Sequence, residues 1–220
     1  QALPLAQGVK MANKDLTVIA SGGDGDGYAI GMGHTIHALR RNMNMTYIVM
    51  DNQIYGLTKG QTSPSSAKGF VTKSTPKGNI EKNVAPLELA LSSGATFVAQ
   101  GFSSDIKALT KMIEDAIHHD GFSFVNVFSP CVTYNKVNTY DWFKEHLTSI
   151  DDIEGYDITD KQLAMKTVLD HESLVKGIVY QDTTTPSYES QISELEHEAL
   201  AKRDIHITEE TFNDLTAQFL

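Results

Sequence analysis

The sequence has only one cysteine and no long apolar run, which excludes disulfide-bonded and membrane-spanning classes of protein. A single cysteine, Cys131, excludes a disulfide within the chain and suits a reducing compartment. No stretch approaches the roughly 20 apolar residues that a membrane-spanning helix needs. No basic segment followed by an apolar one opens the sequence. We therefore predict a cytoplasmic protein without a membrane partner.

Positive charge is also scarce. Lys and Arg number 18 against 28 Asp and Glu, which gives a net charge of −10. Proteins that bind nucleic acid need a basic surface for the phosphate backbone, so we expect no nucleic-acid partner. The 220 residues are 40% hydrophobic, enough for one domain with an apolar core, with or without an appendage.

Residues 17–61 contain the pattern around which the rest of the chain is organised. An apolar run, Val18–Ala20, leads into a glycine-rich turn at residues 22–27. A helical pattern over Tyr28–Arg41 follows, and a second apolar run, Tyr47–Met50, comes next. Strand, glycine turn, helix and strand form the βαβ unit that places an anion at a helix N-terminus. The predicted fold class is α/β, a mostly parallel sheet flanked by helices.

The glycine turn carries two carboxylates, Asp24 and Asp26. Both would repel a diphosphate unless a divalent cation lay between them, and Mg²⁺ takes hard oxygen ligands from a few protein groups plus substrate phosphates. Asn52 follows the second strand and offers a neutral oxygen at the same sheet edge. The turn therefore predicts a metal–diphosphate site.

The spacing of these residues resembles a known signature. Gly23-Asp24-Gly25, then residues 26–51, then Asn52 is similar to the thiamine diphosphate motif. The following DNQIYGLTKGQ, residues 51–61, resembles the beta subunit of the 2-oxoacid:ferredoxin oxidoreductases, closest to the 2-oxoglutarate branch. The resemblance covers residues 1 to about 137 well and the remainder weakly.

The resemblance implies a thiamine diphosphate-binding fold, a set of ligands and a reaction. Asp24 and Asn52 would bind Mg²⁺ through side-chain oxygens and Ile54 through its carbonyl, and the diphosphate would be lined by Gly25, Asp26, Gly56 and Leu57. The family decarboxylates a 2-oxoacid oxidatively, passes electrons through an iron–sulfur cluster to ferredoxin, and transfers the acyl group to coenzyme A. An alpha subunit is the implied partner. The glutamate that activates the cofactor's pyrimidine ring would come from another subunit.

Lys59, with its neighbour Thr58, is the expected substrate contact. Pyruvate-preferring relatives commonly have glycine at the position of Lys59. A lysine there can pair with the second carboxylate of 2-oxoglutarate. The simpler alternative is a solvated lysine at a loop tip.

Cys131 stands in SPCVTYN, at the end of a predicted strand. A lone cysteine is most often a packing residue. The resemblance instead places it at the fourth ligand of a [4Fe–4S] cluster, the other three lying in a segment that precedes residue 1 in the family. We therefore expect an N-terminally truncated chain.

The remaining elements follow from periodicity. In the helix over Tyr28–Arg41, Ala29, Met32, Gly33 and Ile36 have the spacing of a buried face. Ser103 or Ser104 is the expected cap of a helix with Ile106, Leu109 and Ile113 inward, and a strand is predicted over Phe122–Phe128. The segment His118-His119-Asp120 is expected to be solvated.

Two domains are expected: a diphosphate-binding domain over residues 1–138 and an extension over 139–220 that packs on the core or a partner. The extension is predicted to hold a short edge strand at Ile178–Tyr180 and helices that include 191–202. The loop 62–83 carries four lysines and is either a contact for coenzyme A phosphates or a partner, or a solvated loop.

Two other functions compete with this one. Gly25-Asp26-Gly27 followed by Gly31 is close to a dinucleotide-binding turn, with Asp51 where a ribose-binding acid would stand, so an NAD-type domain is the first alternative. A non-catalytic interaction subunit is the second. Asp24 and Asp26 in the turn count against the NAD-type domain, because they would repel a pyrophosphate that carries no metal.

Overall fold

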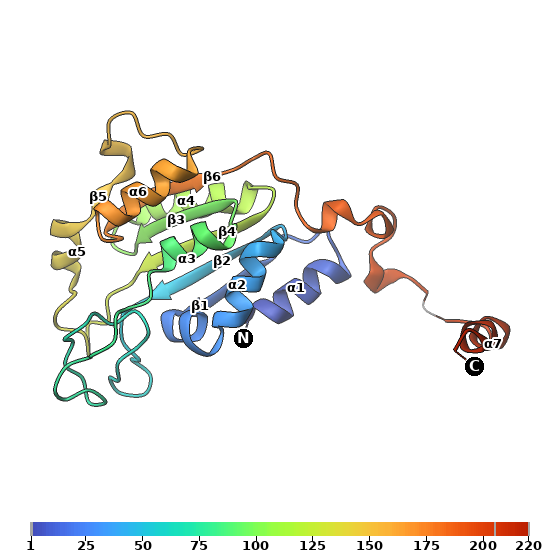
Figure 1. Cartoon of the computed structure of the whole chain (residues 1–220), viewed down its shortest axis with the longest axis horizontal. Helices are drawn as coiled ribbons and strands as arrows, with labels where there is room; N and C mark the ends of the chain where they lie inside the picture. The colour runs from blue at the N-terminus through green and yellow to red at the C-terminus, as the bar shows by residue number, and fades with distance from the viewer. Residues whose placement is uncertain (1, 205, 220) are drawn as a thin grey trace.

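A computed structural model describes residues 2–204 and 206–219 (Figure 1). Six strands form one sheet in the order β1-β2-β4-β3-β6-β5. The strands are Ile19–Gly23 (β1), Met45–Asp51 (β2), Phe97–Phe102 (β3), Phe122–Phe128 (β4), Thr148–Ser149 (β5) and Val175–Gln181 (β6). The first four strands run parallel, and β6 pairs antiparallel with β3. The predicted class, a mostly parallel sheet, is confirmed, and the first four strands end at one common edge.

Helices cover both faces of the sheet. They are Ala2–Ala12 (α1), Met32–Arg41 (α2), Pro86–Ser93 (α3), Ile106–His118 (α4), Tyr140–His146 (α5), Lys161–Asp170 (α6) and Glu209–Ala217 (α7). The larger apolar cluster joins α1, α2, α3 and α6 to one face, and a second cluster joins α4 to the other. In Figure 1 the first group lies in front of the sheet and α4 behind it. No described helix is long and apolar enough to cross a bilayer.

The central strands explain why the sheet needs both layers. Every residue of β3 and β4 is buried, so neither strand shows the alternation of a half-exposed strand. The run FSFVNVF of β4 has the bounds predicted for it, Phe122–Phe128. Its two polar members, Ser123 and Asn126, are hydrogen-bonded inside the protein.

The helix after the glycine turn is not continuous, and two of the four residues predicted for its buried face are wrong, while Met32 packs on the core. A π-helical turn, Asp26–Ile30 (η1), precedes a bend at Gly31, where a Cβ would overlap the Asp26 carbonyl. Ala29 and Gly33 are exposed, and α2 instead buries Thr35, Ala38 and Leu39. A wider turn rotates the residues that follow it, so a uniform period of 3.6 misplaces the face.

Helix α4 also differs from its prediction. Asp105, and neither Ser103 nor Ser104, caps it by accepting a hydrogen bond from the Ala108 amide. Ile106 is 74% exposed, while Met112 and Ala116 face the core. His119 was expected in solvent but is buried, 2.7 Å from Thr96 Oγ1.

The C-terminal third completes the sheet. Strand β6 is longer than predicted and is not an edge strand, because it pairs with β3 on one side and β5 on the other. Three short 3₁₀ turns, Glu189–Gln191, Ser193–Leu195 and Leu200–Lys202, replace the helix expected over 191–202. Helix α7 lies apart from the sheet in Figure 1. The division at residue 138 stays a prediction.

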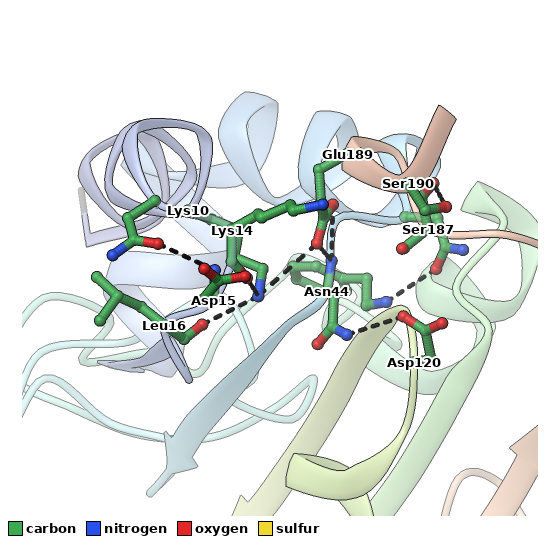
Figure 2. A network of polar contacts seen from close by, with 12 residues as sticks. Lys10, Lys14, Asp15, Leu16, Asn44, Asp120, Ser187, Glu189 and Ser190 are labelled. Carbon is green, nitrogen blue, oxygen red and sulfur yellow. Dashed lines mark hydrogen bonds and ion pairs between the residues drawn. The ribbon is translucent and has the colours of Figure 1, made fainter. Parts of the chain in front are cut away.

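The chain after β6 returns to the amino end of the sheet and is held there by a buried ion pair (Figure 2). Lys10 Nζ of α1 lies 3.8 Å from Glu189 Oε1, and each residue is 5% exposed. The same ammonium donates to the carbonyls of Lys14 and Leu16, and the Asn44 amide donates to Glu189. Every charge in this cluster therefore has its partner within the chain.

Candidate functional site

Two carboxylates meet where β1 and β2 end. Gly23 lies opposite Met50 in the parallel ladder, so the next residues, Asp24 and Asp51, leave the sheet side by side. Asp24 is 3% exposed and Asp51 2%. Sequence reasoning selected Asp24 and treated Asp51 only as a ribose-binding residue of the alternative, so the pairing of the two acids is new.

Burial and mutual repulsion shape the electrostatics of this pair. Burial raises the pKa of Asp24, against the lowering effect of hydroxyl hydrogen bonds. Burial, and then the charge of Asp24, raise the pKa of Asp51 to about 7. No ion pair joins either carboxylate to a Lys, Arg or His side chain in the described residues. Such a site holds either a proton or an external cation.

A turn of serines closes over the two acids. Ser63 Oγ and Ser65 Oγ lie 2.5 Å and 2.6 Å from Asp24 Oδ2, and Ser65 Oγ also lies 2.8 Å from Asp51 Oδ1. Ser66 Oγ donates to the carbonyl of Gln53. These serines were missed because they open a Ser/Thr-rich loop, and their only signal was their position directly after the motif.

The other two expected Mg²⁺ ligands lie on the turn after β2. Asn52 Oδ1 accepts a hydrogen bond from the Ile54 amide at 3.0 Å, which folds the turn tightly. The Ile54 side chain is buried, and no described residue donates to its carbonyl. A buried carboxylate, an amide oxygen and a free carbonyl form a hard-oxygen donor set that fits Mg²⁺.

The glycine turn leaves little free space above Gly25. A Cβ there would overlap the Tyr55 ring, so only glycine fits under this side chain. The Asp26 carboxylate lies over β1, where a Cβ on Gly22 would be 2.6 Å from Asp26 Oδ2. Burial and the Asp26 charge raise the pKa of nearby Tyr47. The side chain of Asp26 thus faces the sheet, and its backbone faces the turn.

The segment from Tyr55 to Gln61 forms a tight loop. The Tyr55 amide donates to the Gln61 carbonyl at 2.9 Å and Gly60 donates back to Tyr55. At the tip, Leu57 is 100% exposed and Thr58 Oγ1 donates to Gln61 Oε1. Lys59 is exposed and has φ of +75°, a conformation that costs a non-glycine residue free energy.

Cys131 lies against this loop. A Cβ on Gly56 would be 3.5 Å from Cys131 Sγ, so the thiol lies close to the motif residue. Tyr134, three residues on, packs in the same way on Gly60. The structure therefore brings the predicted cluster ligand next to the predicted cofactor-lining residue, although the two are 75 positions apart.

A chain of buried polar side chains crosses the sheet from Asp51. Asn126 Nδ2 lies 3.4 Å from Asp51 Oδ2 and 2.9 Å from Gln100 Oε1. Gln100 Nε2 donates at 2.7 Å to the carbonyls of Ser173 and Val175, at the start of β6. The chain was not predicted, because Gln100 and Asn126 occur singly in apolar strands.

A hollow of about 480 Å³ opens beside the serine turn. Its lining includes Tyr28 of η1, Tyr55, Ser63 and the far part of the loop at Asn79–Lys82. A larger hollow of about 580 Å³ lies at the opposite end of the sheet, beside His118 and Asp120, and shares none of these residues. The hollow at the serine turn is the one that adjoins the buried acids.

Two family models match the chain. Residues 1–127 match the family described as thiamine pyrophosphate enzyme, C-terminal TPP binding domain. Residues 131–197 match the family described as the C terminal of the pyruvate ferredoxin oxidoreductase beta subunit. Together the two matches cover the sheet and the segment that returns to its amino end.

Curated relatives agree with these matches. The chain is 42% identical over 202 residues to 2-oxoacid:ferredoxin oxidoreductase subunit beta of Sulfolobus sp., covering 87% of this chain and 66% of the relative. It is 45% identical over 135 residues to 2-oxoglutarate oxidoreductase subunit KorB of Mycobacterium tuberculosis, covering 61% and 36%. The chain thus spans at most about two thirds of these two relatives.

One solved structure is similar over nearly the whole chain. It is described as 2-oxoglutarate:ferredoxin oxidoreductase from Magnetococcus marinus with 2-oxoglutarate, coenzyme A and succinyl-CoA bound. The TM-score is 0.85 at 36% identity, and the match covers 96% of this chain and 72% of the other.

Proposed function

The chain belongs to the beta subunits of the 2-oxoacid:ferredoxin oxidoreductases, and from that premise we propose that it binds Mg²⁺–thiamine diphosphate at the carboxyl end of its sheet. The enzyme of which it is a subunit then performs the coenzyme A-dependent oxidative decarboxylation of a 2-oxoacid, 2-oxoglutarate in first place. It does so in the cytoplasm, with an alpha subunit, and passes its electrons to ferredoxin.

One observation carries the proposal: two carboxylates are buried together, with no ion pair to a cationic side chain among the described residues, in the part of the chain that matches the thiamine pyrophosphate-binding family. Asp24 and Asn52 would hold Mg²⁺ through side-chain oxygens, and Ile54 through the carbonyl that no described residue bonds. The cation would then supply the positive charge that this pair lacks.

The residues around the cation have separate tasks. Gly25 and Asp26 begin a helical turn, and backbone amides at such a start bind phosphate oxygens. Gly56 and Leu57 would form the opposite wall of the diphosphate site, and the exposed Leu57 side chain would be covered in the assembly. The cofactor, when bound, supplies the carbon nucleophile and accepts the electron pair left by decarboxylation.

Lys59 supports 2-oxoglutarate as the substrate. Its backbone has a left-handed conformation that strains a non-glycine residue, and such residues cluster at functional sites. An ammonium beside the reacting carbon would pair with the distal carboxylate of 2-oxoglutarate, and Thr58 would donate a hydroxyl. Lys59 would then select a dicarboxylate over pyruvate.

Cys131 would hold the fourth position of a [4Fe–4S] cluster. The short distance between its Sγ and Gly56 supports a cluster close to the proposed cofactor-binding loop. The five lysines of residues 59–82 are accompanied by one acid, Glu81, so this segment carries +4 while the rest of the chain carries −14. They are Lys59, Lys68, Lys73, Lys77 and Lys82. This basic loop suits coenzyme A phosphates or an acidic partner such as ferredoxin.

The test measures the thermal midpoint of the purified assembly with thiamine diphosphate, with and without Mg²⁺, and with NAD alone. A ligand at 100 times its Kd stabilises the state that binds it by about 2.7 kcal/mol. We expect Mg²⁺-dependent stabilisation by thiamine diphosphate, and its loss in Asp24→Ala. Stabilisation by NAD without metal would favour the dinucleotide alternative and overturn the proposal.

A further inference from the structure

The serine turn is the part of the site whose role the family membership does not explain. Ser63, Ser65 and Ser66 are all buried, and their hydroxyls reach residues at the ends of β1 and β2. Ser66 donates its one hydrogen to the Gln53 carbonyl. Ser63 and Ser65 are left to serve the carboxylates.

The number of hydrogens available decides which carboxylate each of these two hydroxyls donates to. Ser63 Oγ reaches only Asp24 among the two acids, at 2.5 Å, whereas Ser65 Oγ reaches both. Each hydroxyl has one hydrogen, so both acids receive a serine hydrogen only when Ser63 donates to Asp24 and Ser65 to Asp51. In that arrangement Ser63 fixes Oδ2 of Asp24 and Ser65 fixes Oδ1 of Asp51, which orients both carboxylates.

The same turn is the foot of the lysine-bearing loop. Beyond it, the loop is held largely by its own bonds, Gly69 to Asn79, Asn79 to Phe70 and Asn79 Nδ2 to the Ser66 carbonyl. A loop packed by its own side chains is compact, and the contacts at its base set its position on the sheet. Here the base is bonded to the acids.

We propose that Ser63 and Ser65 are positioning residues that orient Asp24 and Asp51 for the cation and thereby couple cation binding to the placement of loop 62–83. The inference rests on the proposed function, because it takes Asp24 to be a metal ligand. When the cation engages Asp24, the carboxylate can no longer turn away from the serines, and the loop loses the freedom to lift.

The test uses the purified assembly with thiamine diphosphate and Mn²⁺ as a spectroscopic substitute for Mg²⁺. Bound Mn²⁺ is measured by electron paramagnetic resonance in wild type, Ser63→Ala, Ser65→Ala and Ser65→Thr. Loss of a group that orients a metal ligand typically weakens metal affinity about 10–100-fold, so we expect the two alanine variants to bind about tenfold more weakly. Ser65→Thr keeps the hydroxyl and should restore affinity.

A matched control is Ser123→Ala, which removes an equally buried hydroxyl that donates to the Ala116 carbonyl away from the acids. It should leave Mn²⁺ affinity within about twofold of wild type, since it does not touch a ligand. Circular dichroism confirms that each variant is folded.

Trypsin cleavage after the exposed Lys68, Lys73 and Lys77 reports the state of the loop directly. Mn²⁺ with thiamine diphosphate should slow cleavage in wild type and Ser123→Ala but not in Ser65→Ala at equal metal saturation. Wild-type affinity or full protection in Ser65→Ala overturns this inference alone. Failure of the wild-type assembly to bind Mn²⁺ overturns the proposed function, and this inference with it.

Discussion

The two ends of the sheet bury charge in opposite ways. At the amino end, Lys10 and Glu189 form an ion pair, and backbone groups also form hydrogen bonds with both side chains (Figure 2). At the carboxyl end, Asp24 and Asp51 are two acids side by side, bonded by the neutral hydroxyls of Ser63 and Ser65. Buried charges are costly unless they are paired, so the first cluster is complete and the second is not.

The difference separates a structural cluster from the proposed binding site. Completeness at the amino end fixes the chain after β6 against α1, because Glu189 and Lys10 come from the two segments. At the carboxyl end the two acids lack a counter-charge, so a ligand that brings positive charge would be stabilised there. Both clusters are equally buried, so burial alone would not have told them apart.

The sharpest test of the contrast removes a charge from the amino end. Lys10→Met leaves Glu189 buried without its counter-charge, and breaking a buried pair in this way costs about 3–5 kcal/mol. Hydrogen exchange of the amides around Asn44 in the assembly should show that loss. Mg²⁺-dependent stabilisation by thiamine diphosphate should be unchanged.

Its control is Lys166→Ala, which breaks an exposed pair with Asp170 on α6. Exposed pairs contribute about 0–1 kcal/mol, so exchange should barely change. If Lys10→Met were no more harmful than this control, the amino-end cluster would not be the fixed structure described.

The pH dependence should differ in sign between the ends. In the metal-free protein the raised pKa of Asp51, about 7, means that the folded state keeps a proton that the unfolded chain releases near pH 4. Stability should therefore fall as pH rises from about 4 to about 7, by about 2–4 kcal/mol. Saturating Mg²⁺ should remove this slope, because the cation takes the place of the proton.

At the amino end burial lowers the pKa of His119. The stability that the neutral imidazole contributes is therefore lost as pH falls below 6.5, the value for an unburied histidine. Comparing Asp51→Asn and His119→Gln with wild type at each pH separates the two slopes. Equal slopes in wild type and Asp51→Asn would contradict the assignment at the carboxyl end.

The smallest expected effect concerns strain. At the amino end Asn42, with φ of +52°, is compensated by hydrogen bonds from Thr96 and the Phe122 amide to its side chain. Lys59, with φ of +75°, has no such bonds among the described residues. Lys59→Gly should raise stability by about 1 kcal/mol.

Lys59→Ala removes the ammonium without relieving the backbone. Catalytic efficiency of the assembly should fall about tenfold or more for 2-oxoglutarate, about 1.4 kcal/mol or more, and hardly at all for pyruvate. Equal loss on both substrates would show that Lys59 does not recognise the second carboxylate.

Much of the fold followed from local pattern. The apolar run of β4 gave its position, because a buried strand bounded by turn residues is a strong local signal. The π-helical turn at Asp26–Ile30 and the non-helical stretch over 191–202 were not predicted. In the first, the Gly31 amide bonds the Asp26 carbonyl five residues back, which glycine at this position permits. In the second, Glu189 binds the Asn44 amide at the amino end of the sheet, and this tertiary contact overrides the local period.

The site was predictable where residues are adjacent to the motif and not where they arrive from elsewhere. Asp24, Asn52 and Ile54 were selected and lie at one sheet edge, although their binding roles stay predictions. Ser63 and Ser65 return through space to Asp24 from 39 and 41 positions away, and Asn126 approaches Asp51 from 75. The spacing of residues in a sequence does not predict contacts between such distant positions.

The bonds of Gln100 have a practical consequence for anyone who shortens this protein. Its amide lies in the middle of the sheet, and its two acceptors, the carbonyls of Ser173 and Val175, belong to the chain that leads into β6. A chain that ends at residue 138 would leave the Gln100 amide without these acceptors. It would also expose the edge of β3, a fully buried strand, to pairing with other copies of the chain. Expression of the first 138 residues alone should therefore yield aggregates, and recovery should return once the chain extends through Gln181.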